Sequence, residues 1–318
     1  MSSLSELASR LVIDVPETLK GRDFTRAADF SADELGLVLE LAGRMKQAPR
    51  EQQRFLPGRA LGLIFNKPST RTRVSFEVGI AQLGGYGLYL RSDDLQLGRG
   101  ETIRDTATVL SRYLDAIMIR TYAQSDVEEL ARHADIPVIN GLTDETHPCQ
   151  ALADVLTIRE RLGRIEGVRV AYLGDGNNVC ASLMVAATRL GASVVAATPA
   201  GYEPDERAVS AARESGPVEV VNDPGEAVRG ADVLYTDVWT SMGQEEERER
   251  RLRDLEGYGI TTELLAQAGN GAIVLHCLPA HYGEEIAEDV LYGSQSAVWD
   301  QAENRLHAQK ALMALVIR

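Results

Sequence analysis

Residues 60–73 read ALGLIFNKPSTRTR, and this stretch decides the type of fold. Its first six residues are apolar, which is typical of a strand buried on both faces of a sheet. Pro68 is well placed in the first turn of a helix, where its missing N–H costs nothing. Val74, Val78 and Ala81 then recur at helical spacing. A strand followed at once by a helix is the building unit of parallel α/β sheets.

The same alternation continues along the chain. Further short apolar runs are separated by segments with helical periodicity, such as Ile103, Ala107, Leu110 and Leu114. The pattern predicts an α/β fold with doubly wound parallel sheets, covered by helices on both faces. The expected strands are residues 60–65, 87–90, 116–119, 168–173, 193–197, 218–221, 232–235 and 272–275.

The length of 318 residues predicts two domains of roughly 150 residues each. We expect a helix near residues 149–163 to carry the chain from the first sheet into the second. A last helix, about residues 301–316, is expected to return to the first domain. The predicted domains are therefore residues 1–148 and 149–300, with residues 301–318 as a C-terminal helix packing on the first.

Charge and composition limit the partners. The net charge of -14 argues against nucleic acid, which requires a basic face, but it leaves room for a small anion bound by a local arginine cluster. No apolar run has the roughly 20 residues needed to cross a bilayer, and the N-terminus does not have the pattern of a signal peptide. Three widely spaced cysteines form no disulfide framework, so a reducing cytoplasm is expected. Because the His–Cys intervals fit no zinc pattern, we expect no metal site.

The run Ser69-Thr70-Arg71-Thr72-Arg73 carries the strongest chemical signal. Hydroxyl groups and the first backbone N–H groups of a helix form an anion site at its positive end. An arginine adds a planar fork that matches phosphate oxygens. The alternative is an ordinary N-cap with surface arginines. Two hydroxyl types and two arginines directly after a strand favour a site for a phosphate-bearing substrate.

The segment Gly174-Asp175-Gly176-Asn177-Asn178-Val179 also follows a strand and opens a helix. It could indicate a dinucleotide site, but the third glycine is replaced by Val179. The next strand also ends without the acidic residue expected to bind a ribose. A strand end in a doubly wound sheet remains a good ligand position, and Asn178 could bind a polar substrate group.

Three other segments gather polar groups near strand or helix ends. His147-Pro148-Cys149-Gln150 could donate to a carbonyl oxygen, although a lone histidine is more often structural. His276-Cys277-Leu278-Pro279 could present a reactive thiol or only a small core residue. Asp237 and Ser241, in a glycine-containing loop, could hold an ammonium group. The chain has neither a Walker A motif nor a Gly-x-Ser-x-Gly elbow, which argues against a P-loop and a serine hydrolase.

Taken together and in their order along the chain, these segments resemble the ornithine branch of the aspartate/ornithine carbamoyltransferase family. Ser69–Arg73 matches the carbamoyl-phosphate signature of that family, and the His-Pro-Cys-Gln and His-Cys-Leu-Pro segments have the forms typical of the ornithine branch. Asp237 with Ser241-Met242-Gly243 matches its amino-acid-binding loop. The resemblance extends over nearly the whole chain, as far as Arg305.

The resemblance implies two doubly wound domains joined by interdomain helices. It also implies a homotrimer or a multiple of it, with an active site between the domains and at the subunit interface. The implied reaction, which needs no cofactor, transfers the carbamoyl group of carbamoyl phosphate to the δ-amine of L-ornithine and gives L-citrulline and phosphate. This reaction belongs to arginine metabolism, and the resemblance is compatible with arginine synthesis and with arginine breakdown.

The resemblance also implies roles for individual residues. Arg120, His147, Cys277 and Asp237 would be catalytic, and Gln96 would reach a neighbouring subunit's site. Asn178, Asp237, Ser241 and Met242 would bind ornithine. Carbamoyl phosphate would be bound by Ser69, Thr70, Arg71, Thr72, Gln96, Arg120, His147, Pro148, Cys149, Gln150, Cys277, Leu278 and Arg305.

Other functions remain open at this stage. Gly98-Arg99-Gly100 departs from the Gly-His-Lys of some relatives, which bears on the dynamics of that loop. A sister enzyme could act on a modified ornithine, a diamine or aspartate. A binding protein of the same fold could have no activity, and a nicotinamide oxidoreductase would have to bind NAD.

Overall fold

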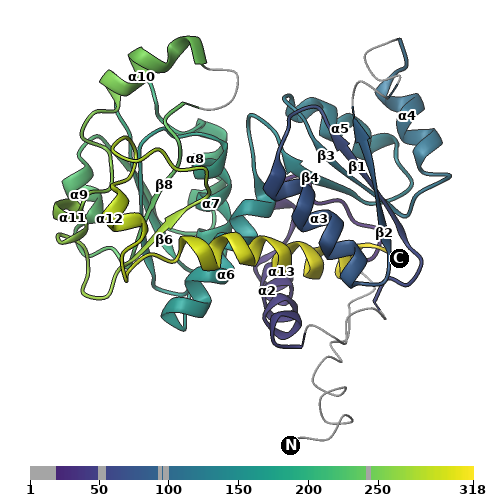
Figure 1. Cartoon of the computed structure of the whole chain (residues 1–318), viewed down its shortest axis with the longest axis horizontal. Helices are drawn as coiled ribbons and strands as arrows, with labels where there is room; N and C mark the ends of the chain where they lie inside the picture. Colours follow the sequence, from purple (N-terminus) through teal and green to yellow (C-terminus); the bar gives the residue numbers. More distant parts are fainter. Residues whose placement is uncertain (1–18, 49–54, 92–94, 96–99, 241–244) are drawn as a thin grey trace, which may run out of the picture. The chain divides into compact units, whose positions relative to one another are not determined.

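The computed structural model describes residues 19–48, 55–91, 95, 100–240 and 245–318, and the chain divides into two units. Unit 1 comprises Met1–Leu152 and Arg305–Arg318, and unit 2 comprises Ala153–Asn304. The chain passes from unit 1 to unit 2 within helix α6 (Pro148–Leu162) and returns within helix α13 (Val298–Val316) (Figure 1). The predicted domain boundaries, after residues 148 and 300, fall within the same two helices.

Unit 1 contains a four-stranded parallel sheet with the order β2-β1-β3-β4. The chain passes first from β1 to β2 on one side of β1 and then to β3 on its other side. Because connections between parallel strands are right-handed, the connecting helices lie on both faces of the sheet. Helices α4 and α5 share a core with β1 and β3 on one face. The elements before α6 are η2 (Ala27–Asp29), α2 (Ala32–Gln47), β1 (Ala60–Phe65), α3 (Thr70–Gln82), β2 (Tyr86–Arg91), α4 (Ile103–Leu110), β3 (Ala116–Arg120), α5 (Gln124–His133) and β4 (Val138–Leu142).

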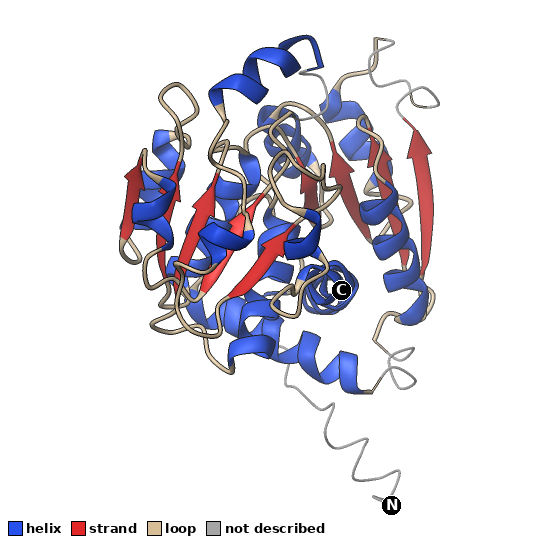
Figure 2. Ribbon diagram, turned by 60° about the vertical axis from the view of Figure 1, so that its left-hand side comes forward, coloured by secondary structure: helices blue, strands red, loops and turns tan. Residues whose placement is uncertain are grey.

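Unit 2 contains a five-stranded parallel sheet with the order β7-β6-β5-β8-β9, in which β5 is central. The strand order reverses at β5, so this unit is also doubly wound and carries helices on both faces (Figure 2). Its elements are β5 (Arg169–Leu173), α7 (Asn178–Arg189), β6 (Ser193–Ala197), α8 (Glu206–Arg213), β7 (Val218–Val221), α9 (Pro224–Val228), β8 (Val233–Thr236), η3 (Glu245–Glu247), α10 (Arg248–Asp254), α11 (Thr262–Leu265), β9 (Ile273–His276) and α12 (Glu288–Leu291).

The predicted α/β class and the eight predicted strands are confirmed, with ends that differ by at most one residue. The strand β4 is absent from the sequence prediction because Asn140-Gly141 reads as a turn. In the fold, Asn140 is fully buried, and its amide bonds to neighbouring polar groups. A Cβ on Gly141 would lie 2.4 Å from Sδ of Met118 and 3.2 Å from the carbonyl oxygen of Ile119, so a side chain there would require β3 residues to shift. Tertiary packing therefore overrides a local turn preference here.

The end of α13 is part of the core of unit 1. Gln309 accepts a hydrogen bond from the hydroxyl of Ser75 at 2.9 Å, and Nζ of Lys310 donates to Gln82 at 2.8 Å. Gly79 in α3 has no side chain, and this lets α13 approach closely at Met313. These contacts hold the part of α13 that follows Arg305 against helix α3.

Helix α3 and strand β2 expose apolar side chains in unit 1. Val74 and Val78 on α3 are 49% and 39% exposed, and Tyr86 and Leu88 on β2 are 51% and 42% exposed. No helix in the described part of the chain is long and apolar enough to span a membrane.

Candidate active site

The carboxyl ends of parallel strands meet at one edge of a sheet, and both units place polar groups there. In unit 1, β1 is followed by Ser69, β3 ends at Arg120, and β4 leads through a short turn to His147. In unit 2, β8 and β9 are followed by Asp237 and Cys277. Each unit therefore has its own cluster, built from segments far apart in the sequence.

Helix α3 begins at Thr70, so Pro68 lies before the N-cap and not in the first turn, where the sequence analysis places it. Ser69 is its N-cap, with an extended backbone, and its hydroxyl accepts the N–H of Thr72 at 3.2 Å. A helix start of this kind directs N–H groups and partial positive charge outwards. Arg71 lies in this first turn and is exposed, so the cluster in unit 1 has an anion-binding face.

Arg305 joins three helices of unit 1. Its guanidinium is buried and donates to Oε1 of Gln150 at 2.8 Å and to Oγ1 of Thr72 at 3.2 Å. These bonds orient the amide of Gln150 at the start of α6 and the hydroxyl of Thr72 in α3. Arg305 and Thr72, both predicted to bind carbamoyl phosphate, are thus in direct contact with each other.

His147 is 5% exposed and lies among cationic groups. Burial, and then the positive charges of Arg305, Arg120 and Arg71, hold the pKa of the imidazole well below its usual value. The ring is therefore neutral at neutral pH and carries one N–H donor. Arg120 is buried as well, at the end of β3, and its carbonyl accepts the N–H of Asn66 at 2.9 Å.

Two other predicted segments of unit 1 have local partners. Cys149 is fully buried, its thiol donates to the carbonyl of Asn140 at 3.3 Å, and burial raises its pKa to about 12. Arg73 pairs with Glu77 at 3.1 Å and lies over the ring of Tyr89, 3.7 Å from its centroid. These contacts give Arg73 a structural role within unit 1.

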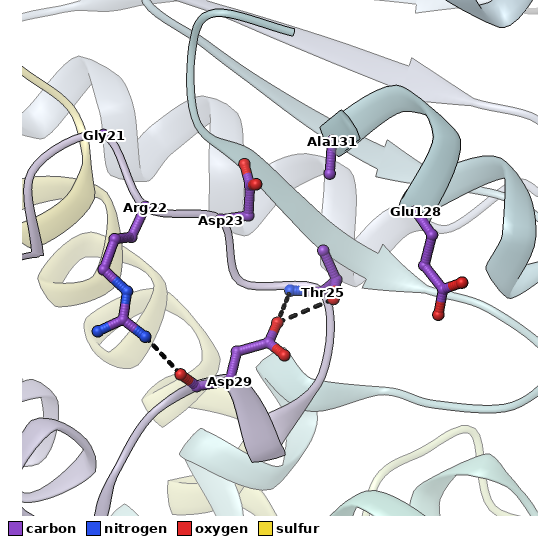
Figure 3. Close-up of a pocket in the computed structure, with 7 residues that line it drawn as sticks. All are labelled: Gly21, Arg22, Asp23, Thr25, Asp29, Glu128 and Ala131. Carbon is purple, nitrogen blue, oxygen red and sulfur yellow. Dashed lines mark hydrogen bonds between the residues drawn. The ribbon is translucent and has the colours of Figure 1, made fainter. Parts of the chain in front are cut away.

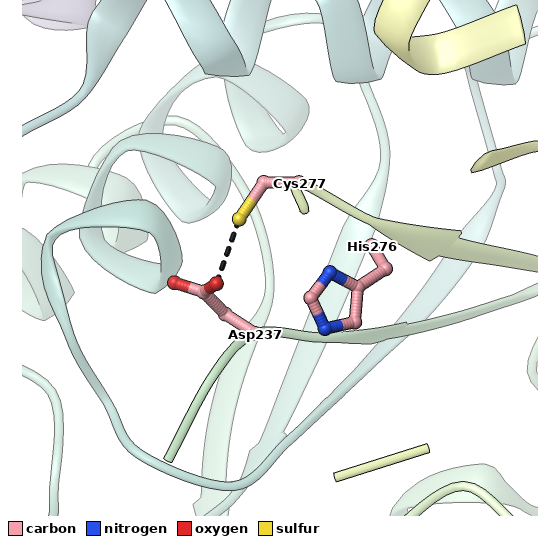
Figure 4. A group of neighbouring side chains, drawn as sticks. All are labelled: Asp237, His276 and Cys277. Atoms are coloured by element: carbon pink, nitrogen blue, oxygen red, sulfur yellow. Dashed lines mark hydrogen bonds between the residues drawn. The ribbon is translucent and has the colours of Figure 1, made fainter. Parts of the chain in front are cut away.

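Asp237 is the centre of the cluster in unit 2. Its carboxylate accepts the thiol of Cys277 at 2.7 Å, the side-chain amide of Asn177 at 2.7 Å and the N–H of Val238 at 2.8 Å. Figure 4 shows the thiol of Cys277 directed at Asp237, with His276 beside them. A carboxylate held by three donors is fixed in orientation. Asn178, the other predicted ligand, is the first residue of α7.

The backbone next to Cys277 is fixed by His276. Nδ1 of His276 accepts the N–H of Leu278 at 2.8 Å, so the proton sits on Nε2, which faces Oε1 of Glu285 at 3.2 Å. Leu278 has a φ of 61°, in the left-handed region that non-glycine residues rarely adopt. Asp237, His276 and Cys277 have potential metal-ligand atoms within 4.8 Å of one another. Both ring nitrogens of His276, however, already form hydrogen bonds with Leu278 and Glu285.

The structure adds two residues that the sequence analysis did not single out. Asn177 caps α7, accepting the N–H groups of Val179 and Cys180 and donating to Asp237, and an asparagine between a strand and a helix was the available signal. Arg251 lies in a mixed-charge run that reads as solvated. It is nevertheless buried, and it donates to Asp175 at 2.8 Å and to the carbonyl of Trp239 at 3.1 Å. Nothing in the local pattern distinguishes Arg251 from its exposed neighbours.

Three predicted residues, Gln96, Ser241 and Met242, lie outside the described residues. A polar pocket of about 570 Å³ in unit 1 contains none of the predicted ones (Figure 3). It borders the start of β4, where Asp23 accepts the N–H of Val138, rather than the carboxyl edge of the sheet. Its polar groups bond one another: the carboxylate of Asp29 accepts the N–H of Thr25 at 2.7 Å, and the backbone carbonyl of Asp29 accepts from the guanidinium of Arg22 at 2.5 Å.

The fold and the two clusters define an α/β enzyme with an anion site in one unit and a carboxylate–thiol pair in the other. The carbamoyl-P binding domain of the aspartate/ornithine carbamoyltransferases matches residues 22–160, and the Asp/Orn binding domain of the same group matches residues 166–316. The chain therefore belongs to the aspartate/ornithine carbamoyltransferase family, as the sequence resemblance predicts.

Individual relatives resemble the chain over almost its full length. The anabolic ornithine carbamoyltransferase of Pyrococcus furiosus is 55% identical over 307 residues, which are 94% of this chain and 98% of that protein. A solved structure of ornithine carbamoyltransferase from Pyrococcus furiosus has a TM-score of 0.90 at 56% identity and covers 94% and 98% of the two chains. A structure of an N-acetyl-L-ornithine transcarbamylase mutant is also similar, with a TM-score of 0.83 at 31% identity and coverage of 93% and 100%.

The different settings of the three cysteines lead to a prediction. Cys277 is partly exposed, whereas Cys149 and Cys180 are buried, and burial raises the pKa of both buried thiols. Because the thiolate is the nucleophile, iodoacetamide should label only Cys277 in the native protein, and all three cysteines in urea. Mass spectrometry of peptides measures the labelling. Native labelling of Cys149 or Cys180 as fast as that of Cys277 would contradict the burial described here.

The environment of His147 predicts a dependence of stability on pH. In the unfolded chain the imidazole binds a proton below a pH of about 6.5, whereas in the folded protein it stays neutral to a lower pH. His147 therefore makes its full contribution to the free energy of unfolding above pH 6.5. This contribution decreases at lower pH, by about 1 kcal/mol between pH 6.5 and 5.5. Urea unfolding should show this fall in the wild type and a smaller one in His147→Asn. Equal slopes in the two proteins would be evidence against a depressed pKa.

Proposed function

We propose that this chain transfers the carbamoyl group of carbamoyl phosphate to the δ-amine of L-ornithine, producing L-citrulline and phosphate. The observation that carries the proposal is the neutral, buried His147 among Arg71, Arg120 and Arg305, next to the helix start at Ser69. Such a cluster offers donors for the phosphate and for the carbonyl oxygen of one small anion. Relatives named ornithine carbamoyltransferase support the choice of ornithine as the acceptor.

Unit 1 would hold carbamoyl phosphate. In this proposal the phosphate lies at the start of α3, bound by Ser69, Thr70, Arg71 and Thr72, with Arg305 as a further cation. The carbonyl oxygen, which gains negative charge in the reaction, accepts from Arg120, His147 and Thr72. The neutral imidazole supplies an N–H donor without adding a fourth cation to the cluster. Gln150, oriented by Arg305, binds the carbamoyl nitrogen, and Pro148 and Cys149 contribute to this segment.

Unit 2 would hold ornithine. Asn178, Asp237, Ser241 and Met242 are proposed to bind its α-amino and α-carboxylate groups. The thiol of Cys277 and the carbonyl of Leu278 would lie near the attacking amine and the carbamoyl group. The hydrogen bond between Cys277 and Asp237 forms a polar pair at which the amine could give up its proton.

The chemical step uses only the two substrates. The neutral δ-nitrogen attacks the carbonyl carbon and forms a C–N bond. The nitrogen becomes positively charged when it forms this bond. The C–O bond to phosphate then breaks, and the phosphate leaves with the bonding electron pair and accepts one proton from the nitrogen. Donors that are already in position stabilise the developing oxyanion and the leaving group, which is the part of the work that the protein performs.

The competing functions have less support. An N-acetylornithine enzyme is the strongest alternative, because a structure with that name resembles the chain, although at 31% identity. Asp237, ready to bind an α-ammonium group, favours free ornithine over a diamine. A dinucleotide at Gly174–Val179 is disfavoured because a Cβ on Gly176 would lie 2.3 Å from the backbone of Pro204, so Tyr202–Pro204 already covers that turn.

Assembly and location are also proposed. The exposed apolar residues of α3 and β2 suit an interface between copies, and we propose a homotrimer in which Gln96 serves a neighbouring subunit's site. Three free cysteines are compatible with the cytoplasm. The name of the Pyrococcus furiosus relative favours the synthetic direction, arginine biosynthesis.

The assignment predicts a substrate preference and the effect of two substitutions. Citrulline should form from carbamoyl phosphate with ornithine, and far more slowly with putrescine, N-acetylornithine or aspartate. Arg120→Ala and His147→Ala should each lower kcat by about 10²–10³-fold, because each removes one donor to the oxyanion. Arg59→Ala, at the other edge of the same sheet and paired there with Asp115, is the matched control and should keep wild-type kcat.

Two results would refute the assignment. One is a higher kcat/KM with another acceptor than with ornithine. The other is near-normal turnover in both Arg120→Ala and His147→Ala, with the fold confirmed by circular dichroism.

The trimer proposal predicts the effect of charge on α3. The double substitution Val74→Glu and Val78→Glu would bury carboxylates at the interface, so sedimentation should show species smaller than a trimer. Trp299→Ser, at a side chain of similar exposure in unit 2, is the control and should leave the mass unchanged. A double variant that sediments like the wild type would exclude this face as the interface.

A further inference from the structure

A group of uncharged polar side chains is buried beneath the segment that carries His147. It consists of Gln124 at the start of α5, Asn140 in β4, and Thr143 and Thr146 in the turn that follows β4. Gln124, Asn140 and Thr143 are each at most 1% exposed. Polar groups at such depth cost free energy unless they are hydrogen-bonded, so their arrangement calls for a specific explanation.

Gln124 is the centre of this group. Its Oε1 accepts hydrogen bonds from Oγ1 of Thr143 at 2.8 Å, Oγ1 of Thr146 at 2.9 Å and Nδ2 of Asn140 at 3.3 Å. Its Nε2 donates to the carbonyl of Thr25 at 3.3 Å. Three donors saturate an amide oxygen, which has two lone pairs, so the side chain has one possible orientation.

The same bonds fix the residue that precedes His147. The N–H of Thr146 donates to Oγ1 of Thr143 at 3.1 Å, and the carbonyl of Thr146 accepts the N–H of Thr143 at 2.8 Å. Oγ1 of Thr146 also accepts from Nδ2 of Asn140 at 3.0 Å. Hydrogen bonds with Thr143, Asn140 and Gln124 therefore hold both the backbone and the side chain of Thr146 in place.

The residues after His147 are tied to the same strand. The thiol of Cys149 donates to the carbonyl of Asn140, and the carbonyl of His147 accepts the N–H groups of Gln150 and Ala151 as α6 begins. His147 is thus bracketed by two attachments to Asn140, one through Thr146 and one through Cys149. If Gln124 moved, Thr146 would move with it, and the backbone of His147 would shift on its N-terminal side.

We propose that Gln124 is a positioning residue for His147, acting through Thr146. This inference rests on the proposed function, in which His147 donates to the carbonyl oxygen. Gln124 does not need to touch the substrate. A buried network in which one side chain is held by several hydrogen bonds restricts the conformation of its neighbours, and a catalytic donor displaced by about 1 Å can lose about 10²-fold in rate.

A double-mutant cycle in kcat tests the proposal. Gln124→Leu keeps the approximate size of the side chain and removes its hydrogen bonds. In the wild-type background it should lower kcat by about 10²-fold. In the His147→Asn background it should lower kcat by less than about twofold, because residues that act as a unit have non-additive effects. The KM for carbamoyl phosphate should change little in both backgrounds.

Asp115→Ala is the matched control. Asp115 accepts the N–H of Ala60 at 2.8 Å and pairs with Arg59 at the other edge of the same sheet. Its loss weakens unit 1 without a route to His147. Asp115→Ala should therefore change kcat by the same small factor in both backgrounds, whatever it does to stability.

A second pair of variants covers the case in which Gln124→Leu does not fold. Thr146→Val removes one hydroxyl that Gln124 accepts and keeps the shape of the side chain, whereas Thr146→Ser retains the hydroxyl. Thr146→Val should show the same non-additivity with His147→Asn, and Thr146→Ser should recover most of the lost kcat.

The imidazole NMR signals of His147, identified by their loss in His147→Asn, give a readout that does not depend on turnover. They should move in Gln124→Leu or Thr146→Val and stay in place in Asp115→Ala. Equal kcat losses in the two backgrounds, or unmoved imidazole signals, would overturn the positioning role. Absence of citrulline formation by the wild type would instead overturn the proposed function, and the NMR comparison would still decide the role of Gln124.

Discussion

Three like charges around one buried imidazole are the constraint on which the cluster in unit 1 depends. Arg71, Arg120 and Arg305 all act on His147, and together with burial they keep it neutral. Cations gathered in this way repel one another, so the protein must hold them by other interactions. Arg305 is held by Gln150 and Thr72, and Arg120 is anchored by the register of β3 against β1. An anion bound among them would relieve the repulsion, which is why the cluster is best explained as a ligand site.

The two clusters solve opposite electrostatic problems. Unit 1 concentrates positive charge around His147, whereas unit 2 presents a carboxylate, Asp237. In the proposed reaction the first cluster would serve the anionic leaving group and the second the amine. In both units the reactive side chains follow directly after buried parallel strands, and buried hydrogen bonds behind them limit their movement. The rigid part of each site is thus the sheet edge, and the chemistry is carried by the few residues beyond it.

Much of the fold could be predicted because it depends on local sequence patterns. The apolar run at residues 60–65 and the helix beginning with Ser69 follow from hydrophobic periodicity and capping, and both appear as expected. The errors have physical causes. Asn140-Gly141 looks like a turn but forms part of β4, because it pairs with β3 and because glycine leaves room for the side chain of Met118. Arg251 looks solvated but is buried between Asp175 and the carbonyl of Trp239.

The sequence by itself determined the fold class, the helix start at Ser69–Arg73 and, through four motifs in their order along the chain, the family resemblance. These properties depend on neighbouring residues or on motif identity, so they can be read without coordinates. Only the tertiary structure decided that Arg305 bonds Thr72 and Gln150, that Asn177 holds Asp237, and that Gln124 gathers Thr143, Thr146 and Asn140. Each of these contacts joins residues from different elements, and burial makes them strong because water is excluded from competing for the same donors and acceptors.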